Sequence, residues 1–453
     1  MKVTRRGFLR TAAAAAGAGA AARFMWPHFW VPRSAQAATG TGLSTGAIII
    51  VLNGGARTQA VFNGTVGLGT NPFGQLSGLP VPLSQVMQGT GLDTPAINAR
   101  LNFITTAQHH NRTGNHDTGR VTACTGWDPE EQRPGILTIL NYVFSFRAIP
   151  CVNIGNDTPT TNIGSEIAST FAPIKISSPL NVQDIVAALQ SAKVSPAELA
   201  RLDAVRMPMQ DRFLRNTRWQ ECRDIPFFQR KSAEIAAQFD NAALDIRSAA
   251  ALGKYADGSD VQNAALRTSF GVSAQGGGNS MGAKAMLALR LRQLGCAGIT
   301  LSSDDNWDLH SNEDQGLPPR AANVGRAIAG LVDHMSRIPD AVERGKTLLD
   351  TTVIMLCTDF NRGNWSTGTG FNGGSGSDHL TGDDKTSLQC LPFIGGGLPG
   401  GKILGEITGN GAPAAGSKRY ETRQLLATLL DLVGVPPGNF FPPSVTSLVG
   451  ELT

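Results

Sequence analysis

Short apolar runs alternate with amphipathic segments along most of this chain, and this alternation constrains the fold more than any other feature. Residues 47–52 form a continuous run of β-branched and apolar residues that ends at Asn53, Gly54 and Gly55. Such a run before a glycine turn is typical of a buried parallel strand. Strands separated by helices need crossover connections, so we expect an α/β fold, a three-layer α/β/α sandwich with a mostly parallel sheet.

The same two patterns predict six further strands and four helices. The strands are expected at 101–105, 149–154, 173–176, 298–302, 352–358 and 391–395. The helices are expected at 182–192, 280–294, 320–337 and 421–433. A charged stretch around 195–270 has no convincing strand, which indicates either a helical insertion in the α/β domain or two ordinary long surface helices.

The first 37 residues have the organisation of an export signal. Arg5-Arg6 followed by Phe8-Leu9 matches the twin-arginine signal, an alanine-rich stretch comes next, and Ala35-Gln36-Ala37 resembles a cleavage site. A chance arginine pair in a basic N-terminus is the alternative. The twin-arginine route carries folded proteins, so we expect residues 38–453 to fold before export. The twin-arginine translocase would then carry them across the inner membrane, and the protein would act in the periplasm or as a secreted protein.

The leader also accounts for the basic character of the chain. It contains six of the 39 basic residues and none of the 35 acidic ones, which leaves a formal charge near −2 on residues 38–453. No basic stripe remains, so we expect no nucleic-acid partner. No later apolar run reaches the 18 or so residues that a membrane span needs, so we expect no membrane span after leader removal.

The cysteine pattern excludes two classes of function. The six cysteines include no Cys-x-x-Cys pair, so neither a thiol redox site nor a structural zinc finger is supported. An oxidising compartment permits disulfides, but cysteines in apolar runs, such as Cys357, are equally well explained as buried thiols.

Three glycine-rich stretches carry little functional signal. Residues 276–278 precede a helix and could face an anion, but Ser280 as the helix N-cap explains them equally well. Residues 363–377 form a long glycine-rich loop, either surface or a lid over a ligand. Residues 395–400 match Gly-x-Gly-x-x-Gly, yet no helix opens there, which argues against dinucleotide binding.

Acidic and histidine side chains follow the expected strands at three places. The carboxyl ends of parallel strands meet at one edge of a sheet, where ligands bind in open α/β folds. Carboxylate oxygens and neutral imidazole nitrogens are ligands of divalent ions such as Zn²⁺ and Mn²⁺. We therefore predict a divalent metal site, and its ligands are Asp308, His310, Asp359 and His379, with Asp378 orienting His379. Structural histidines and helix-capping aspartates are the alternative.

A fourth polar cluster follows the strand expected at 101–105. His109, His110 and His116 lie within eight residues, in a chain with only seven histidines. A solvated polar loop is the alternative interpretation.

Several motifs in this order resemble a known family. They are Leu52-Asn53-Gly54-Gly55-Ala56, Asn115-His116, Trp307-Asp308-Leu309-His310, Asp359-Phe360-Asn361-Arg362, Asp378-His379, and Gly395-Gly396-Gly397 with Gly400-Gly401. Together with the leader they look like the twin-arginine-exported branch of the alkaline-phosphatase/sulfatase-like superfamily. The resemblance covers most of the mature chain and implies a metal site at the carboxyl ends of the strands.

The resemblance also implies a reaction, hydrolysis of a small anionic phosphate or sulfate ester. In hydrolytic members an aspartate after the first strand binds metal, and the nucleophile lies at a helix N-terminus. Here these positions hold Asn53 and His116. The implied roles are attack by a metal-bound water or Thr118, proton transfer by His116, and substrate binding by Arg120 or Arg362. The alternative is a catalytically degenerate relative that binds a metal or ligand and acts with a partner in the envelope.

Overall fold

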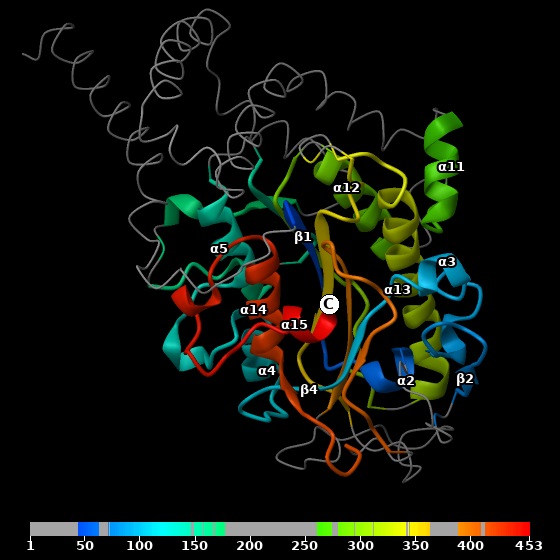
Figure 1. Ribbon diagram of the computed structural model, residues 1–453, viewed down its shortest axis with the longest axis horizontal. Helices are drawn as coiled ribbons and strands as arrows, with labels where there is room; N and C mark the ends of the chain where they lie inside the picture. Colours follow the sequence, from blue (N-terminus) through cyan, green and yellow to red (C-terminus); the bar gives the residue numbers. More distant parts are fainter. Residues whose placement is uncertain are drawn as a thin grey trace, which may run out of the picture. The chain divides into compact units, whose positions relative to one another are not determined.

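The structure is a computed structural model (Figure 1). It describes residues 44–62, 71, 73–145, 149–156, 158–165, 167, 169–176, 261–273, 280–293, 295–310, 312–340, 343, 345–362, 388–408 and 413–453. The chain divides into two compact units, Met1–Thr41 and Gly42–Thr453, and every described residue lies in the second. The leader, the helix expected at 182–192, most of the insertion expected at 195–270, and the loop 363–377 lie outside the described residues.

A nine-stranded sheet, counted over the described residues, forms the centre of the second unit. Its order is β10-β4-β9-β8-β1-β7-β5-β6, with β11 beside β4. The strands are β1 (Gly46–Leu52), β4 (Phe103–Gln108), β5 (Cys151–Ile154), β6 (Ile174–Ile176), β7 (Gly298–Ser302), β8 (Thr352–Thr358), β9 (Gln389–Gly395), β10 (Ile403–Leu404) and β11 (Tyr420–Glu421). A small antiparallel pair, β2 (Gln75–Leu76) and β3 (Leu83–Ser84), stands apart from it.

The sheet is mostly parallel, as the sequence predicts. Strand β1 pairs in parallel with β7 on one side and β8 on the other, and β5 pairs in parallel with β6 and β7. Strand β9 is the exception, because it runs antiparallel to both β4 and β8. All seven residues of β1 are buried, which is typical of a central strand covered on both faces.

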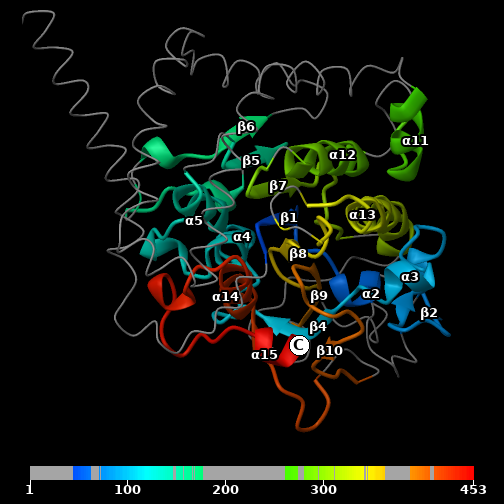
Figure 2. The same ribbon diagram turned by 45° about the horizontal axis from the view of Figure 1, so that its top comes forward.

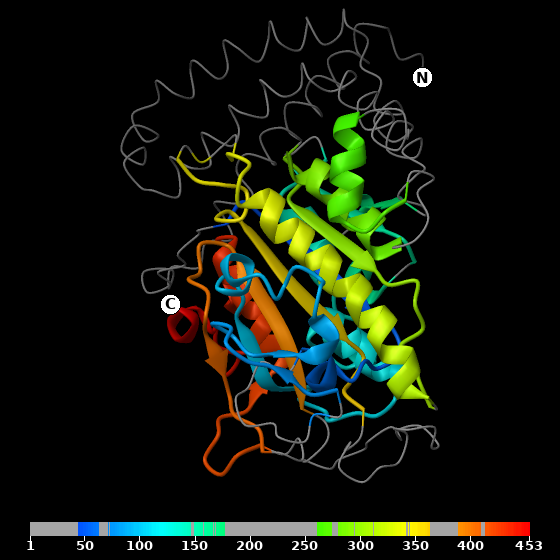
Figure 3. The same cartoon turned by 90° about the vertical axis from the view of Figure 1, so that its right-hand side faces the viewer.

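Helices cover both faces of the sheet, which confirms the three-layer α/β/α architecture (Figure 2). On one face α4 packs against β8, α5 packs against β5 and β7, and α14 packs against α4. On the other face α12 packs against β7 and α13, and α2 packs against β9. In Figure 3 the long helix α13 lies in front of the sheet and runs roughly along the direction of the strands. The helices are α2 (Thr58–Phe62), α3 (Pro95–Asn98), α4 (His116–Thr125), α5 (Ile136–Val143), α11 (Val261–Ser269), α12 (Ser280–Gln293), α13 (Glu313–Met335), α14 (Thr422–Leu432) and α15 (Val449–Leu452).

Five of the six cysteines lie in the residues that the structure describes. Cys124, Cys151, Cys296, Cys357 and Cys390 are buried free thiols, so the buried-thiol interpretation holds for these five. Within the described ranges, none of the helices combines the length and the apolar character that a membrane span requires.

Candidate functional site

A glycine turn after β1 forms the floor of the site. Gly54 and Gly55 have φ of 110° and 72°, a region that L-residues with a side chain rarely adopt. A Cβ at Gly54 would lie 2.5 Å from the backbone nitrogen of Asp308, and one at Gly55 would lie 2.6 Å from the ring of Phe360. The turn therefore needs glycine for both its conformation and its close contacts.

Asp359 is the buried acid of the site. It directly follows β8, whose Thr358 pairs with Leu52 of β1, and only 1% of its surface is exposed. Its Oδ2 accepts a hydrogen bond from the backbone N–H of Gly54 at 3.0 Å and faces Nδ1 of His116 at 2.9 Å. Its Oδ1, and Oδ1 of neighbouring Asn53, are buried without a hydrogen-bond partner among the described residues.

Helix α4 brings His116 to this acid. The side chain of Asn115 caps the helix by accepting a hydrogen bond from the N–H of Thr118, which places His116 at its first position. Gly119 allows the approach to β8, since a Cβ there would lie 2.2 Å from the carbonyl oxygen of Asp359. The imidazole lies 4.7 Å from the ring of Phe360, measured between ring centroids.

The loop after β7 delivers Asp308 to the same place. Trp307 is completely buried, its backbone N–H donates to the carbonyl of Asn53 at 3.0 Å, and its indole N–H donates to Ser303 at 3.0 Å. The buried ammonium of Lys284 holds the start of the loop by donating to the carbonyl of Ser302 at 2.6 Å and to Asp304 at 2.5 Å. Lys284 thus holds the start of the loop, and the hydrogen bonds of Trp307 hold it immediately before Asp308.

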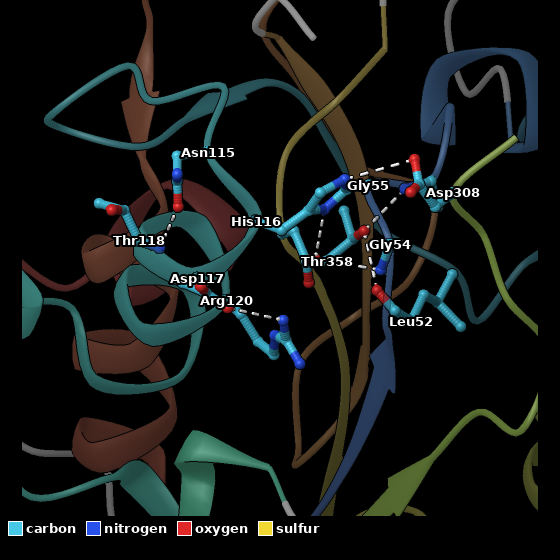
Figure 4. A network of polar contacts seen from close by, with 12 residues as sticks. Leu52, Gly54, Gly55, Asn115, His116, Asp117, Thr118, Arg120, Asp308 and Thr358 are labelled. Atoms are coloured by element: carbon cyan, nitrogen blue, oxygen red, sulfur yellow. Dashed lines mark hydrogen bonds and ion pairs between the residues drawn. The ribbon is translucent and has the colours of Figure 1, made fainter. Parts of the chain in front are cut away.

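Asp308 is the partly exposed acid of the site, and its carboxylate contacts three side chains among the residues described here. Its Oδ1 lies 3.3 Å from Nε2 of His116 and 2.8 Å from Nε2 of His310, and it pairs with the guanidinium of Arg362. His116 therefore stands between two carboxylates, Asp359 at Nδ1 and Asp308 at Nε2. Figure 4 shows the imidazole of His116 facing Asp308. The side chain of His116 is 23% exposed, which leaves the ring accessible from outside.

A buried arginine supplies the positive charge. The side chain of Arg362 is inaccessible to solvent, and it donates to the carbonyl oxygens of Gly54 and Gly55 at 2.9 Å each. Burial, with a contribution from nearby Arg57, lowers the pKa of Arg362 to about 10. The guanidinium therefore still carries its charge at neutral pH.

His109 supports Asp359 from behind. It is fully enclosed, with Nδ1 at 2.8 Å from the hydroxyl of Thr422 and Nε2 at 2.5 Å from the carbonyl oxygen of Asp359. Burial lowers its pKa to about 4, so the ring is neutral at physiological pH. Its neighbour His110 turns away and faces Asp128 at 3.5 Å.

The structure brings four of the predicted site residues together, namely His116, Asp308, His310 and Asp359. Thr118 is two residues beyond His116 on α4, so the two side chains do not share a face. Arg120 lies on the same face as His116, one turn along, and pairs with the exposed Asp117 at 3.2 Å. Asp378 and His379 fall outside the described residues.

These residues do not fit a metal centre in the part of the chain that the structure describes. No group of three or more His, Cys, Asp or Glu side chains there is arranged to hold a metal ion. The carboxylate oxygen that would ligate the ion, Oδ1 of Asp308, instead accepts from a guanidinium that the backbone holds in place. The unpaired oxygens of Asn53 and Asp359 are the only part of the geometry described here that would suit a cation.

Sequence reasoning did not find the residues that support the site. The resemblance implies substrate binding by Arg120 or Arg362, and the structure buries Arg362 against Asp308 and the glycine turn. Arg57 and Glu313 form a buried ion pair at 2.7 Å, and nothing in their local sequence marks it. The short spacing of His109 to His116 was a usable signal, although only His116 reaches the carboxylates.

Comparison with known proteins assigns the family. Residues 85–445 match the model of a family described as "Protein of unknown function (DUF1501)". The chain belongs to the DUF1501 family. No curated protein sequence matches this DUF1501 chain.

Two solved structures show a weak overall likeness to this DUF1501 protein. One is BT1596, a 2-O GAG sulfatase, with 12% identity, a TM-score of 0.35, and coverage of 90% of this chain and 74% of the other. The second is the PsFucS1 sulfatase from Pseudoalteromonas sp., with 12% identity, a TM-score of 0.31, and coverage of 89% and 72%. At such TM-scores neither likeness bears on the chemistry of the site.

Proposed function

We propose that this DUF1501 protein is an ester hydrolase in which His116, oriented by Asp359, transfers the proton. The observation that carries the proposal is the 2.9 Å contact between Nδ1 of His116 and Oδ2 of Asp359 at the start of α4. A buried carboxylate that orients a partly exposed imidazole is the arrangement that general acid–base catalysis uses in unrelated folds.

The contact determines which ring nitrogen does the chemistry. The carboxylate of Asp359 accepts hydrogen bonds, so Nδ1 of His116 carries the proton directed at it. Nε2, which lies 3.3 Å from Oδ1 of Asp308, is then the nitrogen that exchanges a proton, and Asp308 would stabilise the imidazolium formed when Nε2 takes a proton from water. The Gly54 N–H and the enclosed His109 hold the acid from two other sides, which fixes the direction of the imidazole.

The helix start favours an anionic substrate. The first backbone N–H groups of α4 have no partner within the helix, and the helix dipole makes this end positive. Arg120 lies one turn along the same face and adds a second positive group. We therefore propose a phosphate or sulfate ester as the substrate class.

The reaction would proceed in one proton cycle. A water attacks the phosphorus or sulfur atom while Nε2 of His116 accepts one of its protons. The bond to the ester oxygen breaks, and the leaving alkoxide takes that proton from Nε2 to leave as an alcohol. The products are the alcohol and inorganic phosphate or sulfate, and His116 returns to its starting state.

A ligand-binding role is the second candidate. In this geometry the carboxylate of Asp308 is already paired with Arg362 and lies against His116 and His310. That pairing favours a catalytically degenerate member that binds an anionic ligand, with a partner in the envelope.

We also propose that the protein is exported by the twin-arginine translocase and works in the periplasm or as a secreted protein. The support is in the sequence, where Arg5 and Arg6 precede an alanine-rich stretch and a small-residue cleavage pattern at 35–37.

The test is the turnover of p-nitrophenyl phosphate and p-nitrophenyl sulfate by the purified full chain. We expect His116→Gln and Asp359→Asn to reduce kcat by about 10²- to 10⁴-fold, because each removes the proton transfer or its orientation. His110→Gln is the matched control, since His110 is close in sequence but faces Asp128. Wild-type turnover no higher than that of His116→Gln would reject hydrolysis of these esters and favour the binding role.

A further inference from the structure

The guanidinium of Arg362 is held more firmly than an ordinary surface arginine. Nε donates to the carbonyl of Gly55 and Nη2 to the carbonyl of Gly54, both at 2.9 Å, and the group pairs with Asp308. Both glycines belong to the turn after β1, which leaves no room for a side chain beside Phe360 and the Asp308 backbone. The charge therefore cannot leave the site without breaking contacts to the backbone.

A second buried arginine fixes the backbone of Arg362. Nη1 of Arg57 donates to the carbonyl oxygen of Arg362 at 3.3 Å. The charge of Arg57 is balanced by Glu313, to which it donates through Nε at 3.1 Å and Nη2 at 2.7 Å. Because Glu313 serves Arg57, the charge of Arg362 is directed at Asp308.

The site thus contains a permanent cation of its own. We propose that Arg362 is the resident cation of this site and takes the electrostatic role that a divalent metal ion would have beside Asp308. The proposal goes beyond ester hydrolysis, because it concerns what neutralises Asp308 whether or not the protein turns over a substrate. Arg362 acts through Asp308 and touches no substrate, so it is a positioning residue.

One consequence is specific to this assignment. Removal of the guanidinium leaves Asp308 without this cation, while His116 and His310 still lie against its carboxylate. Carboxylate oxygens and imidazole nitrogens are suitable ligands for Zn²⁺ or Mn²⁺. A variant without Arg362 should therefore gain metal binding that depends on Asp308.

The experiment measures bound metal and thermal unfolding of the untagged full chain after dialysis against ZnCl₂ or MnCl₂. We expect the wild type and Asp308→Asn to bind the same amount of metal, because Asp308 holds no metal ion in the wild type. In Arg362→Met we expect the Tm to fall by about 5 °C and to recover when either metal is added, with near-stoichiometric uptake. Arg337→Ala is the matched control, because Arg337 makes an exposed pair with Asp333 on α13, and its metal uptake and Tm should match the wild type.

The opposite pattern would overturn the proposal. That pattern is about one Zn or Mn per wild-type chain, lost in Asp308→Asn, with no gain of binding in Arg362→Met. If Arg362→Met does not fold, Arg362→Lys keeps the charge and should remain unresponsive to metal, whereas a Tm rise with metal in that variant would reject the assignment. Since the readout is metal binding, the result is independent of whether the esters are hydrolysed.

Discussion

At the scale of single residues, the site is a cluster of charged and imidazole side chains that backbone contacts hold in place. His116 faces two acids, Asp359 is enclosed, and Arg362 balances Asp308. Sequence patterns placed the acids correctly after β7 and β8, because an acidic residue that ends an apolar run is visible locally. They did not identify Arg362 as a buried partner of Asp308. That side chain is held by the carbonyl groups of Gly54 and Gly55, which are far from it in the sequence.

The buried pair behind the site should be important for stability. Glu313→Gln removes the carboxylate that balances Arg57, whose side chain is inaccessible to solvent. We expect a loss of about 3–5 kcal/mol in the free energy of unfolding, because an uncompensated charge stays buried. Urea denaturation followed by circular dichroism measures it. Asp117→Asn, which removes an exposed pair with Arg120, should change the midpoint little, and equal effects of the two variants would contradict the expectation.

The lowered pKa of His109 predicts how the stability of the folded protein depends on pH. Its pKa is lowered to about 4 in the folded protein from 6.5, so the folded protein binds this proton less readily than the unfolded chain. Its contribution is therefore constant above pH 6.5, and stability is lost as the pH falls from about 6.5 to about 4, by up to about 3 kcal/mol. Unfolding free energies at several pH values should show a smaller decline for His109→Gln than for wild type. Parallel curves would show that His109 does not cause the decline.

At the scale of elements, the site depends on how closely α4 approaches β8. The expected bounds of β7 and β8 agree with the structure, because continuous buried runs of β-branched residues mark them. The periodicity does not predict helix α4, and only the family resemblance implies a helix start at His116, since the segment has no clear apolar face and its start depends on the Asn115 cap and on the packing of Gly119. The antiparallel direction of β9 could not be predicted from local sequence patterns either, because the direction of a strand depends on the strands with which it pairs.

Gly119→Ala tests the approach of α4 to β8. The added Cβ would lie 2.2 Å from the carbonyl oxygen of Asp359, which belongs to a central strand segment and cannot easily move. The helix must shift instead, so we expect a loss of about 1–3 kcal/mol in stability and a lower kcat in the ester assay. The higher helix propensity of alanine, worth about 1 kcal/mol, does not compensate.

The control for this substitution is Gly450→Ala in α15, where an added Cβ meets nothing within 4 Å. It should leave both the urea midpoint and the turnover close to wild type. A Gly119→Ala protein with wild-type stability and kcat would show that the close approach is not needed.

At the scale of the whole molecule, the alternation of strands and helices was sufficient to predict three layers and a mostly parallel sheet. That arrangement carries the site, because β1, β7 and β8 are parallel neighbours and the segments after them meet at one edge. The match over residues 85–445 assigns the DUF1501 family, and the chemistry proposed above is an inference from the site.

Export is also a property of the whole chain, and it can be tested separately. We expect Arg5→Lys combined with Arg6→Lys to leave an uncleaved precursor in the cytoplasm, because the twin-arginine pair is the recognition element of that route. Cell fractionation with immunoblotting measures it. Periplasmic delivery of the double variant at the wild-type level would reject the proposed route.

The most direct measurement of the central claim is a crystal structure of the protein with orthovanadate, a mimic of phosphoryl transfer, in the presence of Mn²⁺. The account predicts vanadate at the start of α4 within reach of Nε2 of His116, the contact between His116 and Asp359 intact, and Arg362 paired with Asp308. A manganese ion ligated by Asp308 and Asp359, with the guanidinium of Arg362 displaced, would contradict it.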